Sequence, residues 1–239
     1  MKPTKMITWI CSLGLHSPIV TKIIPSASQS ISRSLMNCGS VLDLGCGPSS
    51  PLQYAKNIKY SVGVEVFGPY VEKSKKANIH SKYLQKKFDE LEFEEGSFDA
   101  VILIEVVEHM KKKDGLRLLE KAERWARKKI VLTTPNGYMP MPPSDGNSHQ
   151  EHLSGWDVDE LKNMGFEVSG LAGLKLMRTE QVPETSAVNP DLFVNIKYSP
   201  KPLFFVISAL SQAIVYYFPQ IAYGLFAEKK LSPKKQSGC

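Results

Sequence analysis

The chain has 239 residues, a formal net charge of +6 and a pI near 9.0. This length suits one sheet-centred domain with added segments, and the hydrophobic share of 42% is enough to build its core. The four cysteines are scattered without a C-x-x-C pair, which argues against a zinc knuckle or a disulfide framework and favours a reducing, cytoplasmic setting. The basic residues lack an interleaved aromatic pattern, so the charge does not favour a nucleic-acid partner.

Residues 1–38 precede the first clear strand and form a separate segment. The apolar stretch from Ile7 to Leu15 follows two lysines, as in a secretory signal, but His16 and Pro18 interrupt it and no convincing cleavage site follows. We therefore interpret residues 1–38 as an N-terminal helical cap on the domain that follows.

The segment VLDLGCGP, residues 41–48, indicates a buried strand followed by a glycine turn. Asp43 is the only charged residue in the strand. Gly45 and Gly47 let main-chain N–H groups come close to a ligand that a Cβ would push away. A helix predicted to begin at Pro51 directs its positive N-terminal end at the same place, which suits a ligand carboxylate.

A second apolar strand, Tyr60 to Val66, brings Glu65 to the carboxyl edge of the sheet. An acid at that edge can accept hydrogen bonds from both hydroxyls of a ribose. A G-x-G turn alone is a weak signal, and an acid at this distance strengthens it. Ser50 stands where a nicotinamide dinucleotide fold usually has its third glycine, so the pattern favours an adenosyl ligand over a dinucleotide.

Later segments continue the alternation of strands and helices. Phe98-Asp99 opens the apolar strand Ala100 to Ile104, and another strand, Ile130 to Thr134, ends at Pro135-Asn136-Gly137. Between these strands, apolar residues recur at helical spacing with charges on the opposite side, which predicts a helix that covers the sheet. The apolar positions of this helix are Leu118, Leu119, Ala122, Trp125 and Ala126.

The pattern ends with one more helix and strand. A short helix is predicted from Asp157 to Met164, with Asp157 as its cap and Gly165 as its stop. Phe166 to Leu176 is then predicted as the sixth strand.

Together, these motifs resemble the class I S-adenosylmethionine-dependent methyltransferases, with a more distant similarity to ubiquinone-biosynthesis O-methyltransferases. The run from Glu105 to His109 is similar to the family's signature after the fourth strand. The resemblance covers residues 39–176 and resumes near residues 221–229. It implies an α/β fold with a Rossmann-like, seven-stranded, mostly parallel sheet, helices on both faces and an antiparallel last strand. It also implies that residues 1–38 close over the cofactor.

The resemblance implies S-adenosyl-L-methionine as the cofactor. The residues that it implies for cofactor binding are Asp43, Gly45, Cys46, Gly47, Glu65, Val66, Phe88, Asp89, Ile104 and Glu105. One position departs from the family pattern: relatives usually end the third strand with an acid that reaches the adenine amino group, and this chain has Lys86 and Lys87. An ammonium group cannot accept that hydrogen bond, so Asp89 or the backbone at Phe88 is left to hold the adenine.

Methyl transfer needs no covalent nucleophile, because the sulfonium methyl is already electrophilic and the enzyme aligns an acceptor behind it. A hydroxyl or a protonated amine needs a base to take its proton, and an imidazole or a carboxylate suits this role. The predicted catalytic residues are Glu105, His109 and His152. The loop from Gly137 to Glu151 is longer than an ordinary connection, which favours a functional loop. The predicted substrate-binding residues are Tyr138, Met139, His149 and His152.

A metal site is an alternative at the same edge of the sheet. Glu105, Glu108 and His109 lie on one face of a helical turn, and the later loop adds His149 and His152. This cluster resembles the E-x-x-E-H arrangement of metal-assisted O-methyltransferases, in which a divalent cation polarises a hydroxyl. Methyltransferases without a metal also carry a Glu-His pair there. We therefore assign no metal ligand and leave this alternative open.

The segment from Leu203 to Phe218 is apolar except for Ser208, Ser211 and Gln212, which share one helical stripe. Three interpretations remain open: a helix whose apolar surface is buried against the sheet, a helix in a membrane interface, and a bilayer span completed by the apolar stretch that follows. We favour the first, followed by the last strand near residues 221–229. The predicted domains are a cap (1–38), a catalytic core (39–178), an insertion with the apolar helix and the final strand (179–230), and a basic tail (231–239).

The sequence predicts methyl transfer from S-adenosylmethionine to a hydroxyl or amine of a small-molecule or lipid-linked acceptor. We expect a cytoplasmic enzyme, with peripheral membrane contact through residues 203–218 left open and the oligomeric state undetermined. The alternatives are a nucleic-acid methyltransferase, a non-catalytic adenosyl-binding module at a membrane, and a dehydrogenase, against which Ser50 argues.

Overall fold

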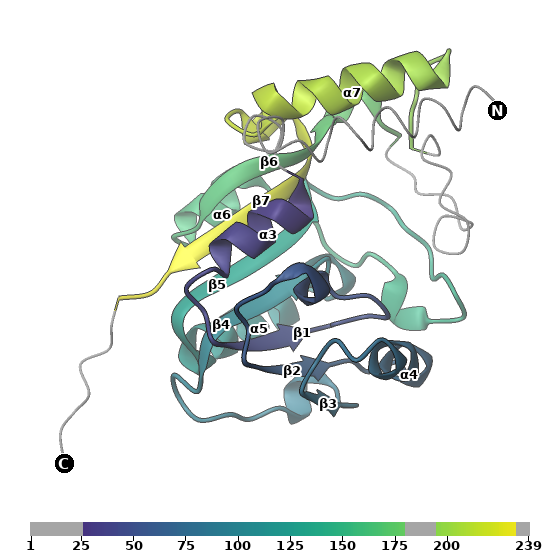
Figure 1. The fold of residues 1–239 in the computed structure, drawn as a ribbon. Coiled ribbons are helices and arrows are strands. Elements are labelled where there is room, and N and C mark those ends of the chain that lie inside the picture. The colour runs from purple at the N-terminus through teal and green to yellow at the C-terminus, as the bar shows by residue number, and fades with distance from the viewer. Residues whose placement is uncertain (1–25, 180–194, 233–239) are drawn as a thin grey trace.

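The computed structural model describes residues 26–179 and 195–232. Its centre is a seven-stranded sheet in the order β3-β2-β1-β4-β5-β7-β6 (Figure 1). The strands are β1 (Ser40–Leu44), β2 (Tyr60–Val64), β3 (Lys82–Leu84), β4 (Phe98–Ile104), β5 (Ala126–Pro135), β6 (Glu167–Leu174) and β7 (Ala222–Lys230). β7 is antiparallel to both of its neighbours, and the other pairs are parallel. The predicted fold class is confirmed.

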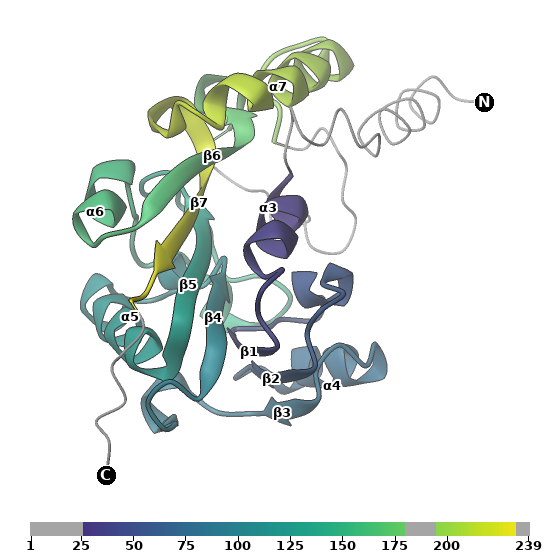
Figure 2. The same cartoon turned by 60° about the vertical axis from the view of Figure 1, so that its left-hand side comes forward.

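Helices cover both faces of this sheet (Figure 2). The α-helices are α3 (Ala27–Ser34), α4 (Gly68–Lys76), α5 (Lys112–Trp125), α6 (Val158–Asn163) and α7 (Lys201–Val215). Alternate side chains of β1 point to opposite faces of the sheet. Leu42 and Leu44 pack with residues of α5 on one face, and Val41 packs with Ile31 of α3 on the other. This alternation is the two-residue period of a strand that is buried on both sides.

The helix predicted at Pro51 is only one 3₁₀ turn, Pro51–Tyr54. Ser50 caps it as expected, and its Oγ accepts a hydrogen bond from the N–H of Leu52 at 3.1 Å. The backbone is already extended at Ala55 and enters β2 at Tyr60. The interval between Pro51 and β2 is too short for an α-helix and its return to the sheet.

Other element boundaries differ by a few residues from the sequence prediction. Ala126 was expected in the covering helix but is the first residue of β5, because α5 ends at Trp125. Strand β6 ends at Leu174 and a 3₁₀ turn follows, so Leu176 lies outside it. Asp157 caps α6 as predicted, and its carboxylate accepts a hydrogen bond from the N–H of Glu160 at 2.9 Å.

The predicted N-terminal cap is described only from residue 26 onward, and residues 1–25 lie outside the described residues. Ser26 forms a capping box with Gln29 at the start of α3. Ile31 and Leu35 of α3 are almost fully buried against the sheet face that includes Ala100 and Val131. The described part of this segment is therefore a core helix.

Helix α7 packs along β6 at the edge of the sheet, the uppermost helix in Figure 1. Its buried residues are Ser208, Ser211, Gln212 and Val215. The expectation that its apolar surface faces the sheet was wrong, because the polar stripe is the buried one. Among the described residues, no helix is both long and apolar enough to cross a bilayer.

Candidate active site

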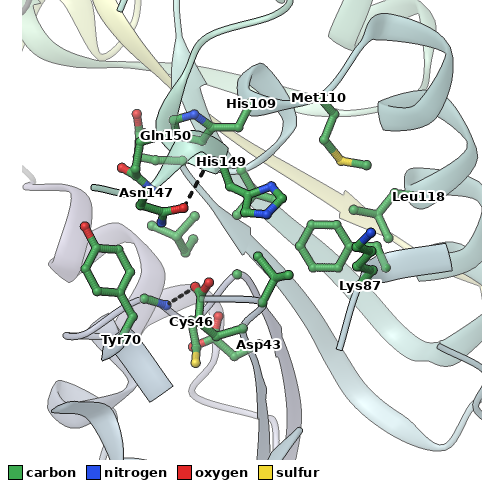
Figure 3. Close-up of a pocket in the computed structure, with 18 of the residues that line it drawn as sticks. Asp43, Cys46, Tyr70, Lys87, His109, Met110, Leu118, Asn147, His149 and Gln150 are labelled. Carbon is green, nitrogen blue, oxygen red and sulfur yellow. Dashed lines mark hydrogen bonds between the residues drawn. The ribbon is translucent and has the colours of Figure 1, made fainter. Parts of the chain in front are cut away.

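A cavity of about 920 Å³ opens at the carboxyl ends of β1, β2 and β4 (Figure 3). The turn after β1, residues 86–89, the end of β4 and the loop at residues 145–150 all contribute to its lining. In a mostly parallel α/β sheet, this edge is where ligands bind. The chain thus brings segments that are more than 100 residues apart to one site.

The glycine turn after β1 forms one wall of the cavity. Gly45 and Gly47 have φ angles of 69° and 55°, a left-handed conformation that side chains disfavour. A Cβ at Gly45 would lie 2.6 Å from a methyl carbon of Val106, so this glycine is needed for packing. A Cβ at Gly47 would meet no described atom within 4 Å. Gly47 therefore borders open space, where a ligand can approach the backbone.

Glu65 lies one residue beyond β2 and is 8% exposed. Its carboxylate accepts hydrogen bonds from the N–H of Gly47 at 3.1 Å and from the N–H of Phe67 at 2.8 Å. Each bond uses one oxygen, and a carboxylate oxygen has two acceptor positions. Glu65 is thus held rigidly by backbone donors and keeps one acceptor position on each oxygen for a ligand diol.

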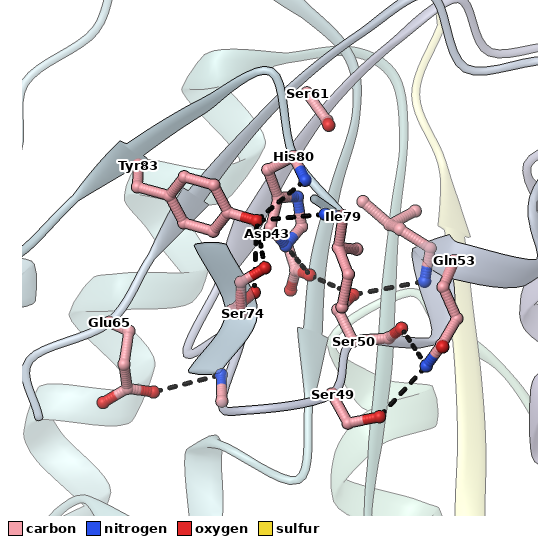
Figure 4. Close-up of polar contacts among 12 residues, drawn as sticks. Asp43, Ser49, Ser50, Gln53, Ser61, Glu65, Ser74, Ile79, His80 and Tyr83 are labelled. Carbon is pink, nitrogen blue, oxygen red and sulfur yellow. Dashed lines mark hydrogen bonds and ion pairs between the residues drawn. The ribbon is translucent and has the colours of Figure 1, made fainter. Parts of the chain in front are cut away.

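Asp43 is buried behind the glycine turn (Figure 4). Its carboxyl accepts a hydrogen bond from Ser50 Oγ at 2.5 Å and lies 3.4 Å from His80 Nε2. Burial raises the pKa of Asp43 to about 7 and lowers the pKa of His80 to about 4. This network holds the glycine turn in place, because Ser50 donates a hydrogen bond to Asp43 and also caps the 3₁₀ turn that follows.

Glu105 follows β4 with a φ of 54°, which is rare for a residue with a side chain. Its N–H donates to the carbonyl of Thr133 at 3.0 Å, and this bond holds the strained backbone in place. Glu105 is exposed and lines the cavity. Strain of this kind at the end of a strand is typical of functional positions. Ile104, the preceding residue, also lines the cavity.

Residues 86–89 line the cavity after the short strand β3. Phe88 and Asp89, the residues predicted to hold the adenine, thus line the cavity, and so does Val66, two residues after β2. Lys86 and Lys87 also line the cavity. The departure from the family pattern thus lies at the cavity itself.

Two histidines lie beside the cavity in a T-shaped contact, with 4.8 Å between the ring centroids of His109 and His152. His109 lines the cavity, and its Nδ1 is 3.2 Å from the carbonyl oxygen of Glu151. His152 is buried, with its Nδ1 2.7 Å from the carbonyl oxygen of Met139. A carbonyl accepts only from N–H, so each ring carries its proton on Nδ1 and leaves Nε2 as an acceptor. Burial lowers the pKa of His109 to about 4.

Glu108 joins these two rings to form a potential metal-ligand set. Ligand atoms of Glu108, His109 and His152 lie within 4.8 Å of one another. The carboxylate oxygens of Glu108 have no hydrogen-bond partner among the described residues, and burial raises the pKa of this residue well above its usual range. Two neutral imidazoles and an ionised Glu108 have the ligand chemistry of a divalent-cation site, and of the three only His109 lines the cavity.

Of the four predicted substrate-binding residues in and after the loop that precedes α6, only one lines the cavity. His149 lines the cavity. Tyr138 is exposed, and its hydroxyl is 3.4 Å from the carbonyl oxygen of His152. Met139 is buried and contributes its backbone carbonyl to His152. Tyr138, Met139 and His152 lie outside the cavity lining.

Tyr70, Asp145 and Asn147 are among the lining residues that the sequence prediction missed. Tyr70 of α4 donates a hydrogen bond to Asp145 at 2.8 Å, which ties this helix to the loop. Asn147 accepts the N–H of His149 at 3.0 Å, while its own Nδ2 is buried and has no partner among the described residues. A buried donor without a partner at a cavity wall indicates a ligand contact. The length of this loop was the only sequence signal for Asp145 and Asn147, and no signal indicated Tyr70.

Residues 42–132 match the family model of the methyltransferase domain. Over these residues the chain carries a methyltransferase domain, and the strand order of the sheet is consistent with it. The match covers the glycine turn, Glu65 and the run from Glu105 to His109. S-adenosylmethionine is accordingly the methyl donor of this enzyme.

Solved structures of low sequence identity share the fold. A chain of the complex between the Haloferax volcanii Trm112 methyltransferase activator and a putative methyltransferase is 14% identical, with 97% of each chain covered and a TM-score of 0.51. The plantazolicin methyltransferase BpumL, solved with a monoazolic desmethylPZN analog and SAH, is 14% identical over 96% of this chain and 90% of its own, with a TM-score of 0.50. PH0226 from Pyrococcus horikoshii OT3 is 20% identical, covers 51% of this chain and 61% of its own, and has a TM-score of 0.41. No curated protein matches the sequence significantly.

Proposed function

We propose that this methyltransferase transfers the methyl group to a hydroxyl or amine of a small-molecule or lipid-linked acceptor. The observation that carries the proposal is the joint presence, in one cavity, of a rigid acid at the sugar-binding position and a neutral imidazole at the end of β4. Glu65 and His109 are those groups. The first suits the donor and the second suits an acceptor that must lose a proton.

For the donor, we assign the open backbone at Gly47 to the amino-acid tail and Glu65 to the ribose hydroxyls. The free acceptor position on each oxygen of Glu65 matches the two hydroxyls of a ribose. Phe88 and Asp89 are assigned to the adenine, since both line the cavity beyond Glu65.

For the acceptor, His109 is assigned as the group that takes up the proton. Its lowered pKa keeps the ring neutral at pH 7, and the Nδ1 contact to Glu151 leaves Nε2 available. His152 packs against this ring and is assigned a positioning role. Glu105 is placed to orient the donor or the acceptor at the same edge. Because the sulfonium supplies the driving force, alignment and exclusion of water are the main tasks of the site.

Two measurements test the proposal. Calorimetry with S-adenosylhomocysteine should show binding, while NAD should show none. Transfer of label from the donor into cell-extract fractions, sorted into lipid, small polar and nucleic-acid pools, should label the lipid or the small polar pool. Label confined to the nucleic-acid pool, or binding of the donor product without transfer into any pool, would contradict the proposed acceptor class.

A further inference from the structure

Helix α7 turns a stripe of large apolar side chains away from the protein. Leu203, Ile207, Leu210, Ile214 and Tyr217 recur every three or four residues, and their exposed fractions range from 36% to 73%. A helix of a soluble domain normally buries such a stripe and exposes its polar side chains. Here the arrangement is reversed, and an exposed apolar patch of this kind marks an interaction surface.

The reversal has a structural cause in β6, which is the edge strand of the sheet. An edge strand has unpaired backbone groups that need partners. Gln212 accepts the N–H of Gly173 at 3.1 Å and donates to the carbonyl of Gly170 at 2.9 Å. Ser211 accepts the N–H of Leu174 at 3.0 Å. The polar side chains of α7 therefore face inward to satisfy this edge.

Close packing fixes the helix in that orientation. A Cβ at Gly170 would overlap the carbonyl of Val215, and a Cβ at Gly173 would overlap the backbone of Ser208. The backbones of α7 and β6 approach this closely only because both positions are glycine. Rotating the helix to bury its apolar stripe would lose these contacts and the hydrogen bonds, so the stripe stays exposed.

The charges around the stripe indicate what it contacts. No acidic residue occurs between residues 195 and 227. Lys197 and Lys201 are exposed at the start of α7, and Tyr217 and Phe218 are exposed at its end. Lysines at one end of an apolar stripe and aromatic residues at the other are typical of helices that lie in the interface of an anionic membrane.

We propose that α7 docks this methyltransferase on the surface of an anionic phospholipid bilayer, with the stripe from Leu203 to Tyr217 in the interface and Lys197 and Lys201 at the headgroups. A second copy of the chain fits less well, because its matching surface offers no acid to these lysines. The helix also meets the carboxyl edge of the sheet: Asn136, just after β5, donates hydrogen bonds to the carbonyls of Pro219 and Ala222 beyond the end of α7. The bilayer would thus lie near the edge that carries the cavity.

Vesicle flotation of the full-length protein tests this proposal. The probes are vesicles of phosphatidylcholine alone and vesicles that also contain phosphatidylglycerol. The double variant Leu210→Glu with Ile214→Glu changes two outward side chains that make no core contact, so it should remain folded. Met36→Glu is the matched control, since Met36 is 60% exposed and lies after α3. Circular dichroism and thermal unfolding verify the fold of each variant.

The wild type and the control should float with the phosphatidylglycerol vesicles, and the double variant should bind at least about tenfold more weakly because apolar burial is lost. Replacing Lys197 or Lys201 by Ala should weaken binding by about fivefold each. The proposal would be overturned by failure of the wild type to float, by equal binding to phosphatidylcholine alone, or by undiminished binding of the double variant. A dimer in sedimentation equilibrium that the double variant dissociates would instead show that a second copy covers the stripe. Binding of S-adenosylhomocysteine is measured separately, so the outcome does not depend on the proposed acceptor.

Discussion

The cavity and the α7 edge both bury polar side chains, but they differ in what those side chains contact. At the edge, Ser211 and Gln212 form hydrogen bonds with the backbone of β6. At the cavity, Asn147 Nδ2 has no partner within the described chain. Buried polar groups that are satisfied internally hold a structure together, whereas unsatisfied ones at a cavity wall await a ligand. Buried polar side chains thus complete the backbone hydrogen bonding at the edge and leave a donor without a partner beside the cavity.

The largest expected effect is at the cavity. His109→Gln should lower the turnover number by at least about a hundredfold, because the imidazole that accepts the proton is lost. Affinity for S-adenosylhomocysteine, measured by calorimetry, should stay within about twofold, since the donor contacts are on other residues. Leu116→Gln, on the exposed part of α5, serves as the control. An unchanged turnover number would show that His109 is not the group that accepts the proton.

Glu65→Ala should weaken S-adenosylhomocysteine binding by about thirtyfold, since hydrogen bonds to a charged acceptor contribute roughly 1.5–3 kcal/mol. Calorimetry gives the dissociation constant. The control is Glu72→Ala, which removes an exposed carboxylate of α4 that pairs with Lys75. If both variants bind as tightly as the wild type, the ribose assignment fails.

At the α7 edge, Gln212→Leu should lower the free energy of unfolding by about 3 kcal/mol, because it leaves backbone groups of Gly170 and Gly173 buried without partners. Ile214→Ala, on the outward face, should change stability by less than about 0.5 kcal/mol. Urea unfolding of both variants measures the contrast. Equal losses would mean that the outward stripe contributes as much to stability as the polar one.

The smallest predicted effect is a pH dependence at Asp43. Its pKa is raised to about 7 in the folded protein from an ordinary 3.8, so the folded state binds this proton more tightly. The stabilisation is therefore complete below about pH 4 and is lost as the pH rises to about 7. Asp43→Asn should become more stable relative to the wild type by about 2 kcal/mol between pH 5 and pH 8. Urea unfolding at the two pH values checks this, and a constant difference would place the ionisation elsewhere.

Much of the cavity lining could be predicted because its signals are local. The turn at Gly45 and Gly47 and the acid Glu65 follow strands whose apolar runs are unambiguous, and parallel topology then brings them to one edge. Asn147 and Tyr70 could not be found this way. Their place at the cavity depends on how a long loop and α4 pack, which no local pattern encodes.

Sequence alone determined the alternation of strands and helices, the glycine turn and the acid Glu65 after the second strand, because hydrophobic period and turn chemistry act over a few residues. It also showed that α7 has a polar and an apolar face. Which face lies inward was decided only by the tertiary structure, since the backbone groups that attract Ser211 and Gln212 belong to β6, about 40 residues earlier in the chain. Long-range hydrogen bonding at the sheet edge outweighed the burial of apolar side chains that the pattern of α7 by itself would favour.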